Sequence, residues 1–173
     1  MSQGPLKNMS IIELGHVIAG PLAATLLADF GAEVIKVENP RGGDMMRDPG
    51  PKAQDDGLGG GTLVRNKRIL AFNWKPLGGR AILRRMVEAS DVLIEIFRPG
   101  VPERADIGPD VLHRWNPNLI SLRNSGYGQD GPMKKAPAFG RAAEAMSGLA
   151  HLTGYPDGPP MHPGFPAADS TSG

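Results

Sequence analysis

The chain has 173 residues, which is the size of one domain with a substantial core. Its 19 Lys and Arg almost balance 18 Asp and Glu, so the net charge of +1 argues against a nucleic-acid partner. The absence of cysteine excludes a disulfide framework, a thiol nucleophile and zinc sites with sulfur ligands. No stretch has the pattern of a signal peptide or a membrane span, so we expect a cytoplasmic protein without a membrane partner.

The first forty residues predict a parallel βαβ unit. An apolar run at residues 9–14 is typical of a buried strand and stops at Gly15. Pro21 suits the first turn of a helix, and Gly31 suits its C-cap. A second strand is expected at residues 33–37. Return through one short helix is the connection that parallel strands need.

Residues 38–65 show no periodicity and are rich in glycine, so we expect a long glycine-rich loop there. A stretch of this kind inside a domain is more often a binding loop than a plain connection.

The remaining chain alternates further strand and helix patterns. Strands are expected at residues 68–72, 91–97 and 119–122. Helices are expected at 110–115 and 141–152, and another, with Ile82, Leu83, Met86 and Val87 on one face, is expected to run to Ala89. This alternation predicts an α/β domain with a mainly parallel sheet and helices on both faces. In such sheets, ligands bind where the strands run into the loops that follow them.

Several polar residues in those loops are candidates for function. His16 lies in the first turn between a strand and a helix, although a histidine there often only bonds to the backbone. The four histidines have no spacing that builds a metal site. Arg98 and Arg104 flank a Pro-Gly turn, where a guanidinium either binds phosphate or remains a solvated surface group. We expect Lys134 and Lys135 to be solvated surface residues.

Among the loop carboxylates, Asp169 stands out because small residues surround it. Small neighbours would let the reactive atom of a ligand come close to the carboxylate. Asp followed by Ser-Thr-Ser is also a common pattern for a helix N-cap, so both interpretations stay open at this point.

Taken in order, the motifs of this chain resemble the class III CoA-transferase family (CaiB/BaiF type). The resemblance rests on these segments: His16-Val-Ile-Ala-Gly-Pro21, Leu27-Ala-Asp-Phe-Gly-Ala-Glu-Val-Ile-Lys-Val-Glu38, Gly42-Gly-Asp44, Arg65-Asn-Lys-Arg68, Phe97-Arg-Pro-Gly100, Asn116-Pro117, Ser125-Gly-Tyr-Gly-Gln-Asp-Gly-Pro132 and Ala167-Ala-Asp-Ser-Thr-Ser-Gly173. Each motif is ordinary by itself, whereas eight in sequence are specific.

The resemblance implies a Rossmann-like domain that binds acyl-CoA and moves CoA between carboxylic acids. Asp169 matches the catalytic aspartate of the family, which forms an anhydride and then an aspartyl-CoA thioester. The implied partners are an acyl-CoA and a carboxylic acid acceptor, with no metal and no tightly bound cofactor. Residues 1–173 would form the N-terminal part of the large CoA-binding domain, without the smaller second domain of the family.

The resemblance also implies a role for each matching position. The thioester end and pantetheine of CoA would meet one turn, its adenine would lie between two aromatic rings, its phosphates would meet one or two arginines, and two further residues would border the acyl pocket. The turn consists of His16, Val17, Ile18 and Ala19, and the two aromatic rings are those of Phe72 and Phe97. The phosphates would meet Arg104, with Arg98 a weaker candidate, and Gly126 and Tyr127 would border the acyl pocket.

Some positions depart from the family pattern. Ile18 replaces a glutamine of the formyl-CoA transferase branch, which disfavours oxalate as a substrate, and Ile96 replaces a common asparagine. The related α-methylacyl-CoA racemases have a catalytic histidine at the position of Phe139, so this second activity is disfavoured, although Gly140 also replaces an aspartate usual in both branches.

Two alternatives remain open. Family members are longer than this chain, so the chain could be a truncated acyl-CoA-binding module without catalytic competence. The resemblance implies interlocked homodimers, threaded together by a C-terminal part that we expect to be largely absent from these 173 residues. Dimerisation therefore does not transfer safely to this chain.

Overall fold

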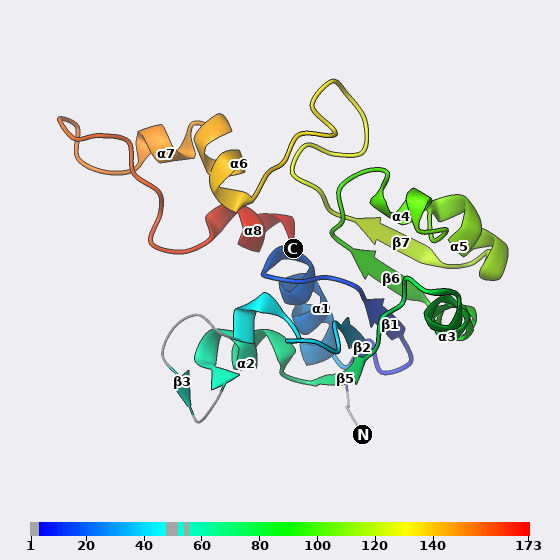
Figure 1. The fold of residues 1–173 in the computed structure, drawn as a ribbon. Helices are drawn as coiled ribbons and strands as arrows, with labels where there is room; N and C mark the ends of the chain where they lie inside the picture. The colour runs from blue at the N-terminus through cyan, green and yellow to red at the C-terminus, as the bar shows by residue number, and fades with distance from the viewer. Residues whose placement is uncertain (1–3, 48–51, 54–55) are drawn as a thin grey trace.

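A computed structural model describes residues 4–47, 52–53 and 56–173, and a parallel sheet forms its centre (Figure 1). Across these residues the sheet has five strands in the order β5-β2-β1-β6-β7, and every neighbouring pair is parallel. A separate pair, β3 and β4, is short and antiparallel. The strands are β1 Ser10–Glu13, β2 Glu33–Glu38, β3 Lys52–Ala53, β4 Asp56–Gly57, β5 Lys67–Ala71, β6 Val92–Glu95 and β7 Ile120–Arg123.

Helices connect the strands and cover both faces of the sheet. They are α1 Ala19–Asp29, α2 Leu58–Val64, α3 Leu77–Glu88, α4 Val101–Arg104, α5 Pro109–Trp115, α6 Gly140–Met146, α7 Leu149–Leu152 and α8 Ala167–Ser172, with a 3₁₀ turn, η1, at Met45–Arg47. In the part of the chain that the structure describes, none of these helices has the length and apolar character needed to cross a lipid bilayer.

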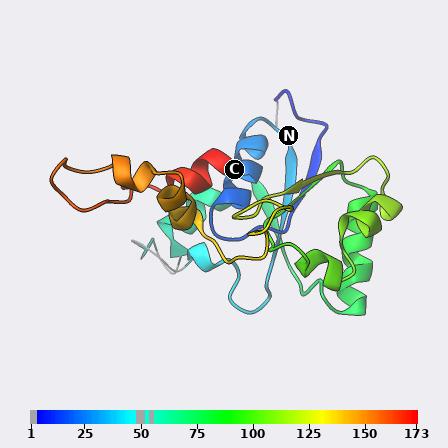
Figure 2. The same ribbon diagram turned by 90° about the horizontal axis from the view of Figure 1, so that it is seen from above.

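The alternation of side chains along the strands builds two apolar cores. Ile12 and Leu93 are buried on one face together with Leu83 of α3 and Leu112 of α5. The residues next to them in sequence face the other side, where Ile11, Ile94 and Val34 pack with the alanines of α1. Figure 2 shows α1 on one side of the strands and α3 to α5 on the other. The predicted α/β fold with two covered faces is confirmed.

The order of the strands creates a crevice at the carboxyl ends of β1 and β6. These two strands are neighbours, but the chain leaves β1 toward β2 and leaves β6 toward β7, in opposite directions across the sheet. Ligands of doubly wound sheets bind at such a switch point. His16 follows β1 and Phe97 follows β6, so the fold brings two of the predicted site residues to this crevice.

Helices α6, α7 and α8 form a lobe beyond the carboxyl ends of β6 and β7 (Figure 1). The loop at residues 124–139 leads from β7 to this lobe, and α8 brings the chain back to pack against α1. A hydrogen bond from Asn124 Nδ2 to the carbonyl of Ser172, at 3.1 Å, joins the loop to α8. The lobe therefore encloses space above the switch point.

The structure differs from the predicted elements in two places. Part of the expected glycine-rich loop at residues 38–65 is helical, because α2 occupies Leu58–Val64 and its Leu63 carbonyl accepts a buried hydrogen bond of 2.9 Å from Thr25 of α1. Residues 48–51 and 54–55 of that stretch lie outside the described residues. The helix expected at residues 141–152 is broken into α6 and α7, since Gly148 adopts a positive φ of 83° between them.

Candidate active site

Buried charges form a charged floor beneath the turn from β1 into α1. Lys36 of β2 is 1% exposed, and its Nζ contacts Glu13 Oε1 at 2.6 Å, Asp44 Oδ2 at 2.8 Å and the carbonyl of Gly15 at 2.9 Å. Lys67 of β5 contacts the second carboxylate oxygen of Glu13 at 2.6 Å. Burial of a charge is tolerated only with close partners of opposite sign. These two lysines and two carboxylates pair with one another and link the neighbouring strands β1, β2 and β5.

This charged floor also fixes the turn from β1 into α1. Asp44 Oδ1 accepts hydrogen bonds from the backbone N–H of Val17 at 3.1 Å and of Met46 at 3.0 Å. Val17 has a φ of +66°, a strained value for a β-branched residue. Gly20 allows α1 to start close to β6, since a Cβ there would lie 2.7 Å from Ile96 Cγ2. The glycines of this turn therefore serve close packing.

A cavity of about 420 Å³ lies between this turn, the end of β6 and the lobe. It brings together most of the residues predicted from the sequence, from segments more than 150 positions apart. Those that line it are His16, Val17, Ile18, Ala19, Phe97, Arg98, Gly126 and Asp169.

Glu95 stabilises the end of β6 next to this cavity. Its carboxylate is 3% exposed and accepts hydrogen bonds from the backbone N–H of Phe97 and from Arg123 Nε, both at 2.6 Å. Burial raises the pKa of Glu95, and the bonds from Arg123 and Phe97 oppose that rise. The position of the Phe97 ring in the crevice is thus fixed through its own backbone.

Two further hollows adjoin the cavity. One, of about 470 Å³, shares His16 and Phe97 with it and contains the predicted Phe72. The other, of about 760 Å³, shares Arg98 and contains the predicted Arg104. Tyr127 lines neither the cavity nor these two adjoining hollows, and its place beside the acyl pocket stays a prediction.

The sequence analysis missed residues in both hollows. The ring of Trp74 lies 5.4 Å from that of Phe97, and Lys75 lies beside it. An aromatic residue just after a predicted strand was the available signal. Lys134 and Lys135, expected to be plain surface residues, line the same hollow as Arg98 and Arg104. The lysines carry no local pattern that distinguishes them from other surface charges.

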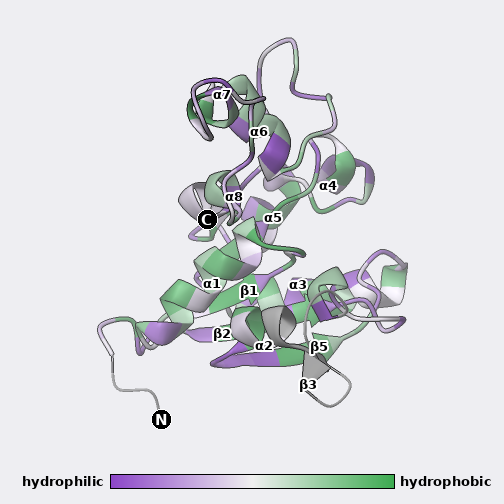
Figure 3. Ribbon diagram, turned by 90° about the vertical axis from the view of Figure 1, so that its left-hand side faces the viewer, coloured by the Kyte–Doolittle hydropathy of each residue, from purple (hydrophilic) through white to green (hydrophobic). Residues whose placement is uncertain are grey.

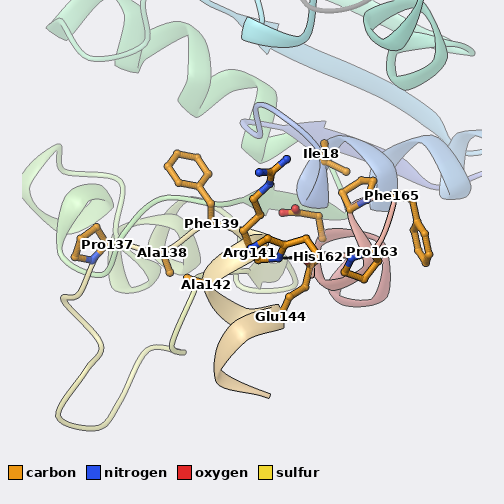
Figure 4. Close-up of a pocket in the computed structure, with 14 residues that line it drawn as sticks. Ile18, Pro137, Ala138, Phe139, Arg141, Ala142, Glu144, His162, Pro163 and Phe165 are labelled. Carbon is orange, nitrogen blue, oxygen red and sulfur yellow. Dashed lines mark hydrogen bonds and ion pairs between the residues drawn. The ribbon is translucent and has the colours of Figure 1, made fainter. Parts of the chain in front are cut away.

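Asp169 lines both the 420 Å³ cavity and another hollow of about 720 Å³, and the second hollow is the one drawn in Figure 4. Its carboxylate packs against the start of α6, where a Cβ at Gly140 would overlap the carboxylate oxygens. Asp169 is the third residue of α8, and Pro166 occupies the N-cap position. The interpretation of Asp169 as a helix N-cap is therefore wrong.

The two carboxylates of this region differ in their electrostatics. Burial raises the pKa of Asp169, and the nearby charge of Glu144 raises it further. Burial also opposes ionisation of Glu144, but His162 Nδ1 at 2.9 Å and the backbone N–H of Ala168 at 3.4 Å outweigh it and lower its pKa. Asp169 is consequently the more basic of the two.

His16 lies at the rim of the cavity, with its ring stacked on Phe97 at a centroid distance of 6.5 Å. Desolvation by the surrounding protein lowers the pKa of His16 although the ring is still exposed, and Asp44 opposes this change. The neutral imidazole is thus favoured. The described residues contain no group of three His, Asp or Glu side chains that could hold a metal ion.

Comparison with known proteins decides the family. Residues 6–173 match the model of CoA-transferase family III. The chain belongs to this family. It is 46% identical over 161 residues to the succinyl-CoA–L-malate CoA-transferase beta subunit of Chloroflexus aurantiacus, covering 92% of this chain and 40% of that protein. It is 43% identical over 162 residues to the acetyl-CoA:oxalate CoA-transferase of Acetobacter aceti, covering 94% and 42%.

A solved structure supports the same assignment. The fold matches a CaiB/BaiF family protein from Brucella suis with a TM-score of 0.91 and 32% identity, over 97% of this chain and 46% of that one. The resemblance to class III CoA-transferases that the motifs predicted is confirmed. The chain spans about two fifths of the length of the curated relatives named here.

Proposed function

We propose that the protein transfers coenzyme A from an acyl-CoA to a carboxylic acid, with Asp169 as the nucleophile. The observation that carries this proposal is the position of the Asp169 carboxylate. It opens onto the cavity at the switch point of the sheet, where α/β folds bind their ligands, and no cation pairs with it among the described residues. A half-buried carboxylate that no cation neutralises is available for attack on a carbonyl carbon.

The reaction runs through two kinds of covalent intermediate. The carboxylate of Asp169 attacks the thioester carbon, the C–S bond breaks, and a mixed anhydride and CoA thiolate form. The thiolate then attacks the Asp169 carbonyl, which gives an aspartyl-CoA thioester and releases the donor acid. The acceptor carboxylate repeats these steps in reverse order, so a new acyl-CoA leaves and Asp169 is regenerated.

This chemistry needs no proton transfer and no general base. A carboxyl with a pKa of about 3.9 in model peptides is ionised at neutral pH, and the raised pKa of Asp169 makes its carboxylate a better nucleophile. The carboxylate that leaves at each stage is also an anion. The role of the fold is therefore to place the reacting groups and to limit the access of water.

The hollows around the cavity fit the parts of coenzyme A. We assign the pantetheine and thioester to the turn from His16 to Ala19, and the adenine to the aromatic hollow of Phe72, Trp74 and Phe97. The phosphates belong with Arg98 and Arg104, because guanidinium groups donate parallel hydrogen bonds to phosphate oxygens. The cytoplasmic location stays a prediction, and the homodimer known for the family is not assigned to this chain.

The test is to trap the covalent intermediate. After incubation with an acyl-CoA labelled in the CoA part, we expect a hydroxylamine-sensitive adduct on the peptide that contains Asp169. Asp169→Asn should lose the adduct, whereas Asp157→Asn, at an exposed position, should keep it. Calorimetry with the same acyl-CoA measures binding separately. Binding without an adduct in the wild-type protein contradicts the transferase and supports the alternative of a CoA-binding module.

A further inference from the structure

The 720 Å³ hollow on the lobe side of Asp169 has apolar walls and a small number of charged groups (Figure 4). Ile18, Phe139 and Phe165 are among the apolar residues that line it, together with several prolines. The charged or titratable residues that line it are Arg141, Glu144, His162 and Asp169.

Of these charged groups, Arg141 alone is both cationic and unpaired. Glu144 is occupied by its hydrogen bond to His162 and by the backbone of Ala168. Arg141 has no hydrogen bond or ion pair with any described residue, and its guanidinium lies beyond ion-pair distance of Asp169. Figure 4 shows its guanidinium directed toward Ile18, with the ring of Phe139 next to it.

The start of α6 places this guanidinium near the nucleophile. Gly140, the first residue of α6, is in contact with the Asp169 carboxylate because it has no Cβ. Arg141 is the next residue. A substrate acyl group that reacts at Asp169 therefore extends into a space where an unpaired guanidinium is within reach.

An unpaired guanidinium in a pocket with apolar walls is suited to a carboxylate, because its planar donors match the two oxygens of that anion. The reacting carboxyl of the substrate is already assigned to Asp169. We propose that the substrate is an aliphatic dicarboxylic acid and its mono-CoA thioester, with the remote carboxylate bound by Arg141. Its methylene groups lie against Ile18, Phe139 and Phe165. This inference rests on the proposed transferase function and adds the substrate class.

The apolar walls also set a lower limit to the length of the acid. Oxalate has no methylene group to place against them, and Ile18 offers no hydrogen bond to a polar acyl group. A four- or five-carbon diacid has an apolar middle and two charged ends. We therefore choose glutarate as the probe, with its monoamide, glutaramate, as a control of equal size that lacks the second charge.

The kinetic test compares the two acceptors in the purified protein. We expect kcat/KM for glutarate to exceed that for glutaramate by about 10- to 100-fold, the range that one charge-assisted hydrogen bond supplies. Arg141→Gln should remove this preference through KM for glutarate, with kcat changed little, and Arg141→Lys should retain part of it. Arg114→Gln, at an exposed position in α5, should behave as wild type. Equal use of both acids, or an unchanged preference in Arg141→Gln, overturns the proposal.

A binding measurement separates this inference from the transferase function. Asp169→Asn cannot form the covalent intermediates, so its affinity for glutaryl-CoA and pentanoyl-CoA reports recognition alone. We expect tighter binding of glutaryl-CoA, and loss of that difference in the Asp169→Asn, Arg141→Gln double variant. If the preference depends on Arg141 but no adduct forms on wild-type Asp169, the binding site stands and the transferase function fails. If adducts form but neither measurement shows a preference, the diacid proposal fails.

Discussion

Asp169 and Glu144 are two carboxylates that line the same hollow but differ in their electrostatic environment. Glu144 has a histidine and a backbone N–H as partners, so its charge is compensated locally. Asp169 has no such partner among the described residues and is next to the charge of Glu144. The nucleophilic role proposed for Asp169 requires this kind of uncompensated anion, and the folded state bears an electrostatic penalty for it.

This penalty predicts how Asp169→Asn changes stability. The folded pKa of Asp169 is raised, so its contribution to stability is complete below the unfolded pKa and is lost as the pH rises through the folded pKa. Asparagine has no charge to lose. We expect Asp169→Asn to be more stable than wild type at pH 7, and this advantage to shrink as the pH approaches 4. Urea unfolding at both pH values measures it. A pH-independent difference between the two proteins contradicts the prediction.

Several of the site residues that the sequence predicted follow strands, whereas Asp169 in α8 was predicted from its small neighbours and the family motif. His16 to Ala19 come after β1 and Phe97 after β6, so the strand pattern and the family motifs both pointed to them. Arg141, Glu144 and His162 were missed because their relation to Asp169 depends on how α6 and α8 pack, with contacts 18 to 24 positions apart in the sequence. No local periodicity encodes such a contact.

At the scale of secondary-structure elements, the packing at the start of α6 depends on Gly140, which has no side chain. A Cβ at Gly140 would overlap the Asp169 carboxylate, whereas alanine is a better helix residue than glycine by up to about 1 kcal/mol. Stability and activity should therefore respond in opposite directions when Gly140 is replaced.

We expect Gly140→Ala to reduce transfer by about 100-fold, the effect of moving a reacting group by roughly 1 Å. Its unfolding free energy should stay equal to wild type or rise by up to about 1 kcal/mol. The matched control is Gly78→Ala in α3, where a Cβ meets nothing within 4 Å. Steady-state transfer and urea unfolding of both variants provide the comparison. Full activity in Gly140→Ala would show that the position of the carboxylate is not critical.

The turn between β1 and α1 depends on Asp44 in a similar way. Asp44 pairs with buried Lys36 and holds the strained backbone of Val17. Removing one partner of a buried ion pair leaves an uncompensated charge, which costs about 3–5 kcal/mol. We expect Asp44→Ala to destabilise by that amount, and Asp157→Ala, at an exposed site, to stay within about 0.5 kcal/mol of wild type in urea unfolding. A small loss for Asp44→Ala contradicts the assigned role.

At the scale of the whole molecule, the sheet and the lobe differ in how firmly they are packed. The central strands β1 and β6 are covered by apolar cores on both faces. The lobe has short helices and many exposed apolar side chains; in the view of Figure 3 apolar colouring continues into α7. Exposed examples are Met146, Leu152, Tyr155 and Phe165. The sequence predicted the sheet because its signals are local, and it mispredicted α6 and α7 as one helix because the break depends on the backbone of Gly148.

This difference predicts a pattern of amide hydrogen exchange. We expect the amides of β1 and β6 to exchange slowest and those of α7 fastest, since protection follows local packing. In the proposed binding mode acyl-CoA would contact both the turn after β1 and the lobe, so it should slow exchange in α6 and α8 while β1 stays unchanged. Mass spectrometry with and without acyl-CoA measures this. Protection confined to the sheet would mean that the lobe does not contribute to the site.

The buried ion pairs and the exposed arginines of the site should respond differently to the salt concentration. Lys36, Lys67, Glu13 and Asp44 balance one another out of reach of solvent ions, so added salt leaves their attraction almost unscreened. Arg98 and Arg104 face an open groove, where the same ions compete directly with a phosphate. If Arg98 and Arg104 bind the phosphates as proposed, raising the ionic strength should weaken the binding of coenzyme A while the geometry around Asp169 stays intact, so that salt raises KM and leaves kcat unchanged.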